Sequence, residues 1–210
     1  MTYLSAANDS LNSSHKSLTP KALVAGVITG SLLLGGCQQA PTYDYIQGET
    51  MGTSYHITFQ KPKEVDEEAI KQAIDKRLQE INVSMSTYME DSTISKFNRL
   101  KAGEPMQVDP DFIQVLQDSK QVYDQSGGAF NPTVMPLINL WGFGSVMTAE
   151  RLQNPPSAEQ IMAAKSLLGF EDIKVSGNTL TKDKDNVELD FSAVAKGYGV
   201  DVIAEVLRKD

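Results

Sequence analysis

The sequence contains a single cysteine, Cys37, among its 210 residues. Without a second cysteine the chain can form no internal disulfide, so disulfides contribute nothing to its stability. Histidine is almost as scarce, with His15 near the N-terminus and His56 on the polar face of an expected strand. A histidine in that position is usually solvated, and we assign no chemical role to His56.

A run of basic residues is also absent. The formal net charge is −8 at pH 7, and an acidic chain without a basic cluster is a poor candidate for binding nucleic acid. If the protein binds a phosphorylated ligand, local hydrogen-bond donors or a metal ion must overcome this background charge.

Charge is missing altogether from residues 125–149, which include the only tryptophan, Trp141. The run is not a membrane helix, because glycines and prolines interrupt it and weaken helical hydrogen bonding. These residues are Gly127, Gly128, Pro132, Pro136, Gly142 and Gly144. The sequence therefore predicts irregular apolar backbone. Two interpretations stay open: a buried core loop, or a surface where Phe130, Trp141 and Phe143 stack on a planar ring system.

The first 36 residues have the features of a lipoprotein signal peptide. Lys16 and Lys21 flank the start of the apolar segment 22–34, and the tetrapeptide LGGC follows at residues 34–37. This tetrapeptide resembles a bacterial lipobox, in which the cysteine is acylated and becomes the new N-terminus. A single membrane-anchoring helix is the alternative, although the apolar stretch is short for a span. We expect lipidation at Cys37 and anchoring on the periplasmic side of the inner or outer membrane.

The rest of the chain divides into a tether, residues 37–43, and one domain, residues 44–210. Hydrophobic periodicity and turn residues predict helices and short strands in an α+β order. We expect extended segments at 43–47 and 54–60 around a turn at 48–53, and a strand at 187–191. A hairpin is expected from 173–175 and 179–181. Helices are expected from the Asp66 cap to about Tyr88, within 91–98, over 110–123, from Ser157 to Gly169, and over 194–209.

The last expected helix runs to Asp210 with an apolar face that has no evident partner. Val200, Ile203, Ala204 and Leu207 lie on this face, and no C-cap follows them. We therefore expect residues 44–210 to be the N-terminal part of a longer domain that continues beyond Asp210.

The junction between the expected strand at 187–191 and this helix is a candidate anion site. Asp190 at the strand end can accept hydrogen bonds from backbone N–H groups, which favours its charged form. Lys196 on the first helical turn adds a positive charge suited to phosphate. From this motif alone, a capped helix with a solvated lysine is the favoured explanation of the same residues, and the anion site is the alternative.

Four segments together resemble one known family. GETMGTSYHITF, MSTYMEDSTISKFN, GGAFNPTVMPLINLWGFG and LDFSAVAKGYGVD occur in this order. They are similar to the FAD:protein FMN transferases, long named thiamine biosynthesis lipoprotein ApbE. The likeness runs from about Gly48 to the end of the chain. It implies an ApbE-like, T-fold-related α+β fold with mixed or antiparallel sheets packed against helices.

The resemblance implies a Mg2+-dependent enzyme that moves the FMN moiety of FAD to a threonine hydroxyl of an acceptor protein and releases AMP. Typical acceptors are extracytoplasmic flavoprotein subunits of Na+-pumping and related electron-transport complexes. Some relatives instead hydrolyse FAD to FMN and AMP. A lipid-anchored flavin-binding module without catalysis, or a structural envelope lipoprotein, are the other possibilities.

The resemblance also implies roles for individual residues. The positions that match FAD contacts are Met51, Tyr88, Ala129, Phe130, Asn131, Asp190 and Lys196. Asn131 replaces the aspartate of many members, which keeps the hydrogen-bonding shape and removes a charge. Ala193 matches a position whose backbone carbonyl binds Mg2+.

The remaining catalytic groups are expected beyond Asp210. The other metal ligands of the family, an aspartate and a threonine, have no counterpart in these residues. No residue is assigned as the general base, and we expect that group beyond Asp210 as well. Activity is therefore expected from the full-length protein and not from these 210 residues alone.

Overall fold

The computed structural model describes residues 41–60, 66–143 and 154–209. The signal peptide, Cys37, most of the tether and residues 144–149 of the charge-free run lie outside the described residues. Internal contacts separate residues 1–41 from residues 42–210, and only the second unit is described below. Within the described residues, none of the helices combines the length and the hydrophobicity that a bilayer crossing needs.

Asp210 lies outside the described residues too. The helix that was expected to run to Asp210 is described as far as Lys209. The expectation of a general base and further metal ligands beyond Asp210 therefore stays a prediction.

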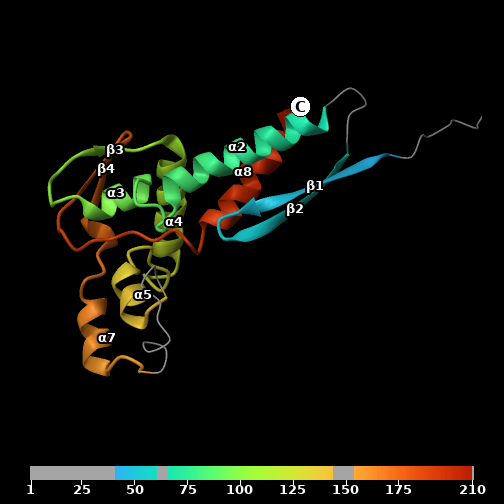
Figure 1. Cartoon of the computed structure of the whole chain (residues 1–210). Coiled ribbons are helices and arrows are strands. Elements are labelled where there is room, and N and C mark those ends of the chain that lie inside the picture. Colours follow the sequence, from blue (N-terminus) through green and yellow to red (C-terminus); the bar gives the residue numbers. More distant parts are fainter. Residues whose placement is uncertain (1–40, 61–65, 144–153, 210) are drawn as a thin grey trace, which may run out of the picture. The chain divides into compact units, whose positions relative to one another are not determined.

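Helices and short antiparallel strands make up this unit (Figure 1). The strands are β1 (Tyr43–Thr50), β2 (Thr53–Gln60), β3 (Met106–Gln107), β4 (Ile173–Ser176) and β5 (Thr179–Lys182). The helices are α2 (Glu67–Met85), α3 (Thr93–Arg99), α4 (Pro110–Gln125), α5 (Met135–Trp141), α7 (Ala158–Lys165), the 3-10 helix η2 (Phe170–Asp172) and α8 (Ala195–Lys209). One sheet has the order β1-β2 and the other β3-β5-β4. The expected α+β class with antiparallel sheets is confirmed.

Strands β1 and β2 form a hairpin with a two-residue turn. Their ladder closes at the pair Thr50–Thr53, which leaves only Met51 and Gly52 outside it. Both turn residues have positive φ angles, 49° and 69°, as a tight hairpin whose twist matches its strands requires. The expected turn over 48–53 was too long, because Gly48 belongs to the ladder and lies opposite Tyr55.

Helix α2 forms as its apolar stripe predicts. The Asp66 side chain caps it by accepting a hydrogen bond from the Glu68 amide at 3.1 Å, since the first amides of a helix lack partners within it. All five residues of the stripe are buried: Ile70, Ile74, Leu78, Ile81 and Met85. The helix ends at Met85, three residues before the expected Tyr88, and the chain then turns into a loop.

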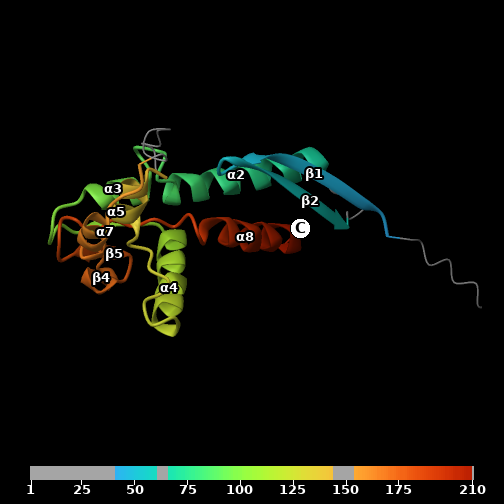
Figure 2. The ribbon, with the colours of Figure 1, turned by 90° about the horizontal axis from the view of Figure 1, so that it is seen from below.

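Two hydrophobic clusters form the core. In the first, the Phe112 ring lies between Phe97 and Phe191, with ring centroids 6.4 Å and 5.1 Å apart. The second consists of Ile46, Ile70, Ile74, Leu78 and Ile203 and joins the hairpin, α2 and α8. Figures 1 and 2 both show α8 lying along α2. Met51 packs against both clusters, so the hairpin turn lies where they meet.

Residues 187–191 form no strand with any other of the described residues, so the expected strand was wrong. The Asn98 side chain takes the place of a neighbouring strand. Its Nδ2 donates to the Leu189 carbonyl at 2.9 Å, and its Oδ1 accepts from the Leu189 amide at 2.7 Å. The Asp190 amide donates to the Pro132 carbonyl at 2.8 Å. A side chain and a loop thus satisfy backbone groups that a strand would otherwise pair.

The charge-free run contains a helix, α5, where irregular backbone was expected. Pro136 lies in its first turn, where a missing N–H group costs nothing. Gly142 follows the helix with a left-handed φ of 78° and ends it. The helix breakers therefore mark the ends of α5 and leave its interior free of them. Helix α7 begins with the expected capping box of Ser157 and Gln160 but ends at Lys165, before the expected Gly169.

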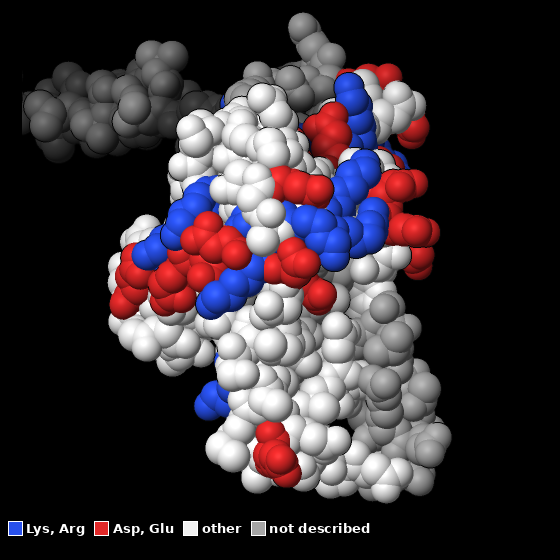
Figure 3. Space-filling view, turned by 90° about the vertical axis from the view of Figure 1, so that its left-hand side faces the viewer, with Lys and Arg blue, Asp and Glu red and all other residues white. Residues whose placement is uncertain are grey.

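Most charged side chains lie on the surface. Lysine and arginine mix with aspartate and glutamate on the face drawn in Figure 3. Around β4 and β5, Lys184 pairs with Asp172 at 2.9 Å and Lys174 with Asp183 at 3.3 Å. Exposed pairs of this kind contribute about 0–1 kcal/mol each.

Lys182 on β5 is an exception, because it is fully buried. Its Nζ donates to the carbonyl oxygens of Asn98, Asp185 and Val187 at 3.0, 3.0 and 2.9 Å. The ammonium group also lies 5.4 Å from the centre of the Phe97 ring. Burial lowers the pKa of Lys182, while the three carbonyls give the buried charge the partners it needs.

Replacing Lys182 with methionine should lower the free energy of unfolding by about 2–4 kcal/mol, because buried carbonyl groups lose their donor. Urea unfolding followed by circular dichroism measures this. Lys101, whose exposed ammonium group is 3.4 Å from Asp185, provides the control, and Lys101→Met should change stability by less than about 0.5 kcal/mol. Equal effects of the two substitutions would show that the buried lysine has no special structural role.

Candidate binding site

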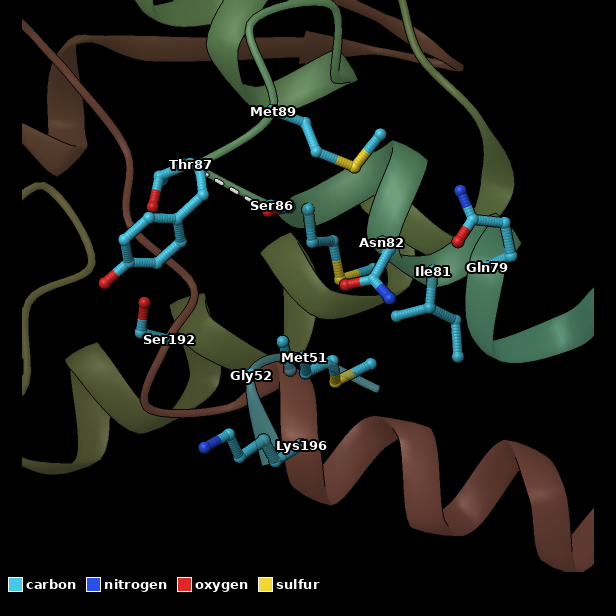
Figure 4. A pocket seen from close by; sticks show the side chains of 13 residues that line it. Met51, Gly52, Gln79, Ile81, Asn82, Ser86, Thr87, Met89, Ser192 and Lys196 are labelled. Carbon is cyan, nitrogen blue, oxygen red and sulfur yellow. Dashed lines mark hydrogen bonds between the residues drawn. The ribbon is translucent and has the colours of Figure 1, made fainter. Parts of the chain in front are cut away.

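A cavity of about 630 Å3 lies between the hairpin turn, the C-terminal half of α2 with the loop that follows, and the start of α8. Figure 4 shows Asn82, Ser86 and Met89 on one side, and Met51, Gly52 and Lys196 on the other. The full lining is Met51, Gly52, Gln79, Ile81, Asn82, Met85, Ser86, Thr87, Tyr88, Met89, Ser192, Ala195 and Lys196. Three of the seven predicted FAD contacts, Met51, Tyr88 and Lys196, therefore share one cavity.

The hairpin turn is held at the cavity by close packing. A Cβ on Gly199 would lie 3.3 Å from Cε of Met51, so a glycine here allows the turn to approach α8. On the other side, Asn82 Nδ2 donates to Thr50 Oγ1 at 3.0 Å. These two contacts fix Met51 between α2 and α8.

The loop after α2 presents Tyr88. Ser92 Oγ donates to the Ser86 carbonyl at 2.7 Å, and the Tyr88 amide donates to Ser86 Oγ at 3.3 Å. The Tyr88 side chain is 72% exposed although it lines the cavity. Its ring thus offers a flat apolar face at the mouth, against which a planar ligand can stack.

Asp190 contacts the loop that carries Asn131 through one backbone hydrogen bond. The Asp190 amide bonds the carbonyl of Pro132, the residue after Asn131. The Asp190 carboxylate is buried and accepts a hydrogen bond from the Ser192 amide at 2.8 Å, and Ser192 lines the cavity. Asn131 Oδ1 accepts from the amide and the hydroxyl of Thr133 at 2.9 and 2.7 Å. Both predicted residues thus belong to the backbone framework beside the cavity and not to its lining.

The other two predicted contacts, Ala129 and Phe130, lie on the loop before Asn131. Their amides donate to the carbonyl and the hydroxyl of Ser126 at 3.3 and 3.0 Å. Neither residue lines the cavity, and nor does Trp141, which is 38% exposed. The wall of this cavity opposite α8 comes from α2 and the loop after it.

Sequence analysis missed several lining residues. Gln79 and Asn82 belong to α2, a helix to which we assigned no site residue, and Ser86 begins the following loop. The available signal was their position: both side chains lie off the apolar stripe and near the C-terminal end of the helix. Nothing in the sequence alone indicated that this end faces Lys196.

A magnesium site does not form from the described residues. They contain no group of three or more histidine, cysteine, aspartate and glutamate side chains that could hold a metal ion. The predicted ligand, the backbone carbonyl of Ala193, would supply a single oxygen, whereas Mg2+ needs a near-octahedral set of oxygens. The residues described here therefore do not fit a complete metal centre.

Arg77, Asp111 and Tyr198 form a hydrogen-bonded cluster that joins α2, α4 and α8. Arg77 donates to both carboxylate oxygens of Asp111 at 2.6 Å, and the Tyr198 hydroxyl donates to Asp111 Oδ1 at 2.6 Å. The hydrogen bonds from Arg77 lower the pKa of Asp111, and the one from Tyr198 adds to this effect. Burial, followed by the bond to Asp111, raises the pKa of Tyr198 to about 12.

The fold and the cavity define an α+β ligand-binding protein whose site brings together a hairpin turn, a helix end and a helix start. Comparison with known proteins narrows this class. The ApbE family model matches residues 51–210, and the chain belongs to the ApbE family. The resemblance seen in the four sequence segments is thereby confirmed.

Two individual relatives show the extent of this similarity. The chain is 38% identical over 178 residues to the FAD:protein FMN transferase of Vibrio cholerae, covering 84% of this chain and 52% of the relative. The Haemophilus influenzae protein of the same name is 33% identical over 198 residues, covering 90% and 56%. Thus the chain spans about half the length of the curated relatives it matches.

Solved structures show the same fold. The flavin transferase ApbE from Vibrio cholerae matches with a TM-score of 0.75 and 36% identity, over 80% of this chain and 54% of that one. The apo form of the Pseudomonas stutzeri flavinyl transferase ApbE matches with a TM-score of 0.73 and 32% identity, over 80% and 54%.

Asp111 should make stability depend on pH below about pH 4. Its pKa is lower in the folded than in the unfolded state, where it is about 3.9. The stabilisation is therefore complete above the unfolded-state pKa and is lost as the pH falls through the folded-state pKa. The difference in unfolding free energy between the wild type and Asp111→Asn should stay constant from pH 7 to about 5 and shrink below about 4.

Urea unfolding at a series of pH values measures this difference. Asp118 is exposed on the same helix, so Asp118→Asn should change stability by less than about 0.5 kcal/mol throughout. A difference for Asp111→Asn that does not vary with pH would contradict the ion pair.

Proposed function

We propose that the protein in its complete form is a flavin transferase that moves the FMN moiety of FAD to a hydroxyl of an acceptor protein and releases AMP. One observation carries this proposal: Met51, Tyr88 and Lys196, from three segments far apart in the sequence, line one cavity. The relatives from Vibrio cholerae and Haemophilus influenzae, both FAD:protein FMN transferases, support it. The family match supports it further.

The cavity offers contacts for both chemical parts of a dinucleotide, the planar ring systems and the phosphates. Met51, Ile81, Met85 and Met89 provide apolar contacts, and Tyr88 offers a ring face. The Lys196 ammonium group and the Ser192 hydroxyl face the same space and suit phosphate oxygens. The chain is acidic overall, so this local positive charge is needed to hold an anionic ligand.

The reaction follows from these positions. The acceptor oxygen, on a threonine in our proposal, forms a bond to the phosphorus of the FMN moiety. The bond from that phosphorus to the bridging oxygen breaks, and AMP leaves with that oxygen. Negative charge builds on the phosphate oxygens during this exchange. Lys196 binds the phosphate oxygens both before and during this exchange, while the framework of Asp190 and Pro132 fixes the turn that leads into α8.

We include Mg2+ in the proposal as the family resemblance implies it, with the Ala193 carbonyl as one ligand. Bound there, the ion would act as a Lewis acid on phosphate oxygens. Its other ligands must come from outside the described residues. The general base that takes the proton of the acceptor hydroxyl is likewise proposed to lie beyond Asp210.

Incubating the complete protein with FAD, Mg2+ and an acceptor should give a fluorescent flavin band on a denaturing gel and an equimolar release of AMP. Free FMN and AMP without labelled acceptor would instead identify an FAD pyrophosphatase. Tight FAD binding without AMP release, indifferent to Mg2+, would identify a flavin-binding module. Intact FAD and an unchanged melting temperature would exclude all three, because ligand binding raises the melting temperature by mass action.

Two variants test the roles of the residues in this assay. Lys196→Met should raise the KM for FAD about tenfold, and Asp190→Ala should lower kcat more than it changes FAD affinity. Lys165, exposed on α7, provides the matched control, and Lys165→Met should leave both constants unchanged. A KM for Lys196→Met equal to that of the control would remove Lys196 from the site.

The location belongs to the proposal as well. We infer that Cys37 carries a lipid anchor that holds the domain on the periplasmic side of the inner or outer membrane. Flavoprotein subunits of Na+-pumping or related electron-transport complexes are suitable acceptors, because their flavin sites face the same side.

Cys37→Ser should release the protein from the membrane fraction and abolish its labelling by radioactive palmitate, because a single residue provides the acylation site. Fractionation and autoradiography of expressing cells measure both. A membrane-bound Cys37→Ser protein would contradict lipid anchoring. Ser5→Ala, in the same leader, is the control and should change neither.

A further inference from the structure

The Arg77–Asp111–Tyr198 cluster joins α2 and α8, the two helices that contribute walls to the cavity, through α4. Arg77 precedes Gln79 by two residues on α2, and Tyr198 follows Lys196 by two residues on α8. Gln79 and Lys196 line opposite walls of the cavity. Asp111 on α4 therefore connects both walls through side chains that lie close to the lining but do not belong to it.

The geometry of α8 explains how this connection sets the direction of the Lys196 side chain. Successive residues of an α-helix are rotated by about 100°, so Lys196 and Tyr198 point to roughly opposite sides of α8. Tyr198 packs against the first hydrophobic cluster and bonds Asp111, while Lys196 lines the cavity. Fixing Tyr198 on one side of the helix thus fixes the direction of Lys196 on the other.

The first turn of α8 needs such an anchor. Glycines flank Tyr198 at positions 197 and 199, and glycine is the least favourable helix residue apart from proline. A Cβ on Gly199 would lie 3.3 Å from Cε of Met51, so a larger residue there would require the Met51 side chain to shift. The turn that carries Lys196 is therefore weak by itself, and its tertiary contacts decide its conformation.

We propose that Tyr198 is a positioning residue for FAD: its hydroxyl bond to the Arg77-paired Asp111 holds the first turn of α8 and thereby Lys196 against the phosphates. The proposal rests on the proposed function insofar as FAD is the ligand. The pKa shifts of Tyr198 and Asp111 favour the protonation states that their hydrogen bond requires. With a raised pKa the Tyr198 hydroxyl remains a donor, and with a lowered pKa Asp111 remains a charged acceptor.

Tyr198→Phe, introduced into the complete protein, tests the proposal. The substitution removes one hydroxyl group and keeps the ring in the core. We expect the KM and Kd for FAD to rise about tenfold with kcat within about twofold. Amides of residues 195–199 should exchange hydrogen about tenfold faster. Asp111→Asn keeps an oxygen that can accept from Tyr198, so its Kd for FAD should rise less than that of Tyr198→Phe.

A double-mutant cycle separates positioning from general destabilisation. If Tyr198 acts through Lys196, Tyr198→Phe in the Lys196→Met background should change the KM less than about twofold. A full tenfold effect in that background would overturn the proposal.

Tyr55 provides a matched control. Its hydroxyl donates to Asp75 at 2.6 Å, and Asp75 pairs with Lys71 on α2. This cluster also joins a tyrosine, an aspartate and a basic residue, but its hydrogen bonds link Tyr55 only to α2 and not to α8. Tyr55→Phe should leave the KM for FAD and hydrogen exchange at 195–199 unchanged, and an equal effect of both substitutions would overturn the proposal.

Failure of the proposed function gives a different result. A wild-type protein that neither binds nor converts FAD would end the flavin assignment, while hydrogen exchange at residues 195–199 would still test the anchor. If FAD binds and reacts but Tyr198→Phe changes neither the KM nor the exchange, only the role of Tyr198 is refuted.

Discussion

The contact between Met51 and Gly199 is the constraint on which the site depends. Met51 occupies a left-handed turn position that a non-glycine residue rarely adopts, and its side chain packs against both hydrophobic clusters. The absence of a Cβ on Gly199 lets the turn reach α8. If this approach were lost, the cavity would lose the wall formed by the turn.

Buried polar groups hold the segment before α8 in one arrangement. Lys182 binds three backbone carbonyls, among them that of Asn98, and the Asn98 side chain binds Leu189. Asp190 follows and bonds the loop that carries Asn131. Burying a charged group costs free energy unless it has partners, so this chain of contacts stabilises one arrangement of the segment before α8. The first turn of α8 is then held from its other side by Tyr198.

Local sequence patterns predicted the elements whose formation depends on residues close together in the chain. The apolar stripe of α2, its Asp66 cap, the Ser157 capping box and the hairpin of β4 and β5 all follow from residues close in the chain. The failures have physical reasons as well. A strand was expected at 187–191, but the Asn98 side chain bonds the backbone there in place of a partner strand. Helix α5 was missed because Pro136 and Gly142 lie at its ends, where helices tolerate them.

The sequence by itself determined the family, most of the helices, the two hairpins, and the residue types that suit a dinucleotide: an amine at the start of a helix, aromatic rings and a turn that contains glycine. Only the tertiary structure decided which of these residues meet. It brought Met51, Tyr88 and Lys196 to one cavity, placed Asp190 and Asn131 in the framework beside it, and left Trp141 out of its lining. The reason is that a repeating pattern reveals which face of a helix is buried but not which distant segment covers it. The packing of α8 along α2 settles that question.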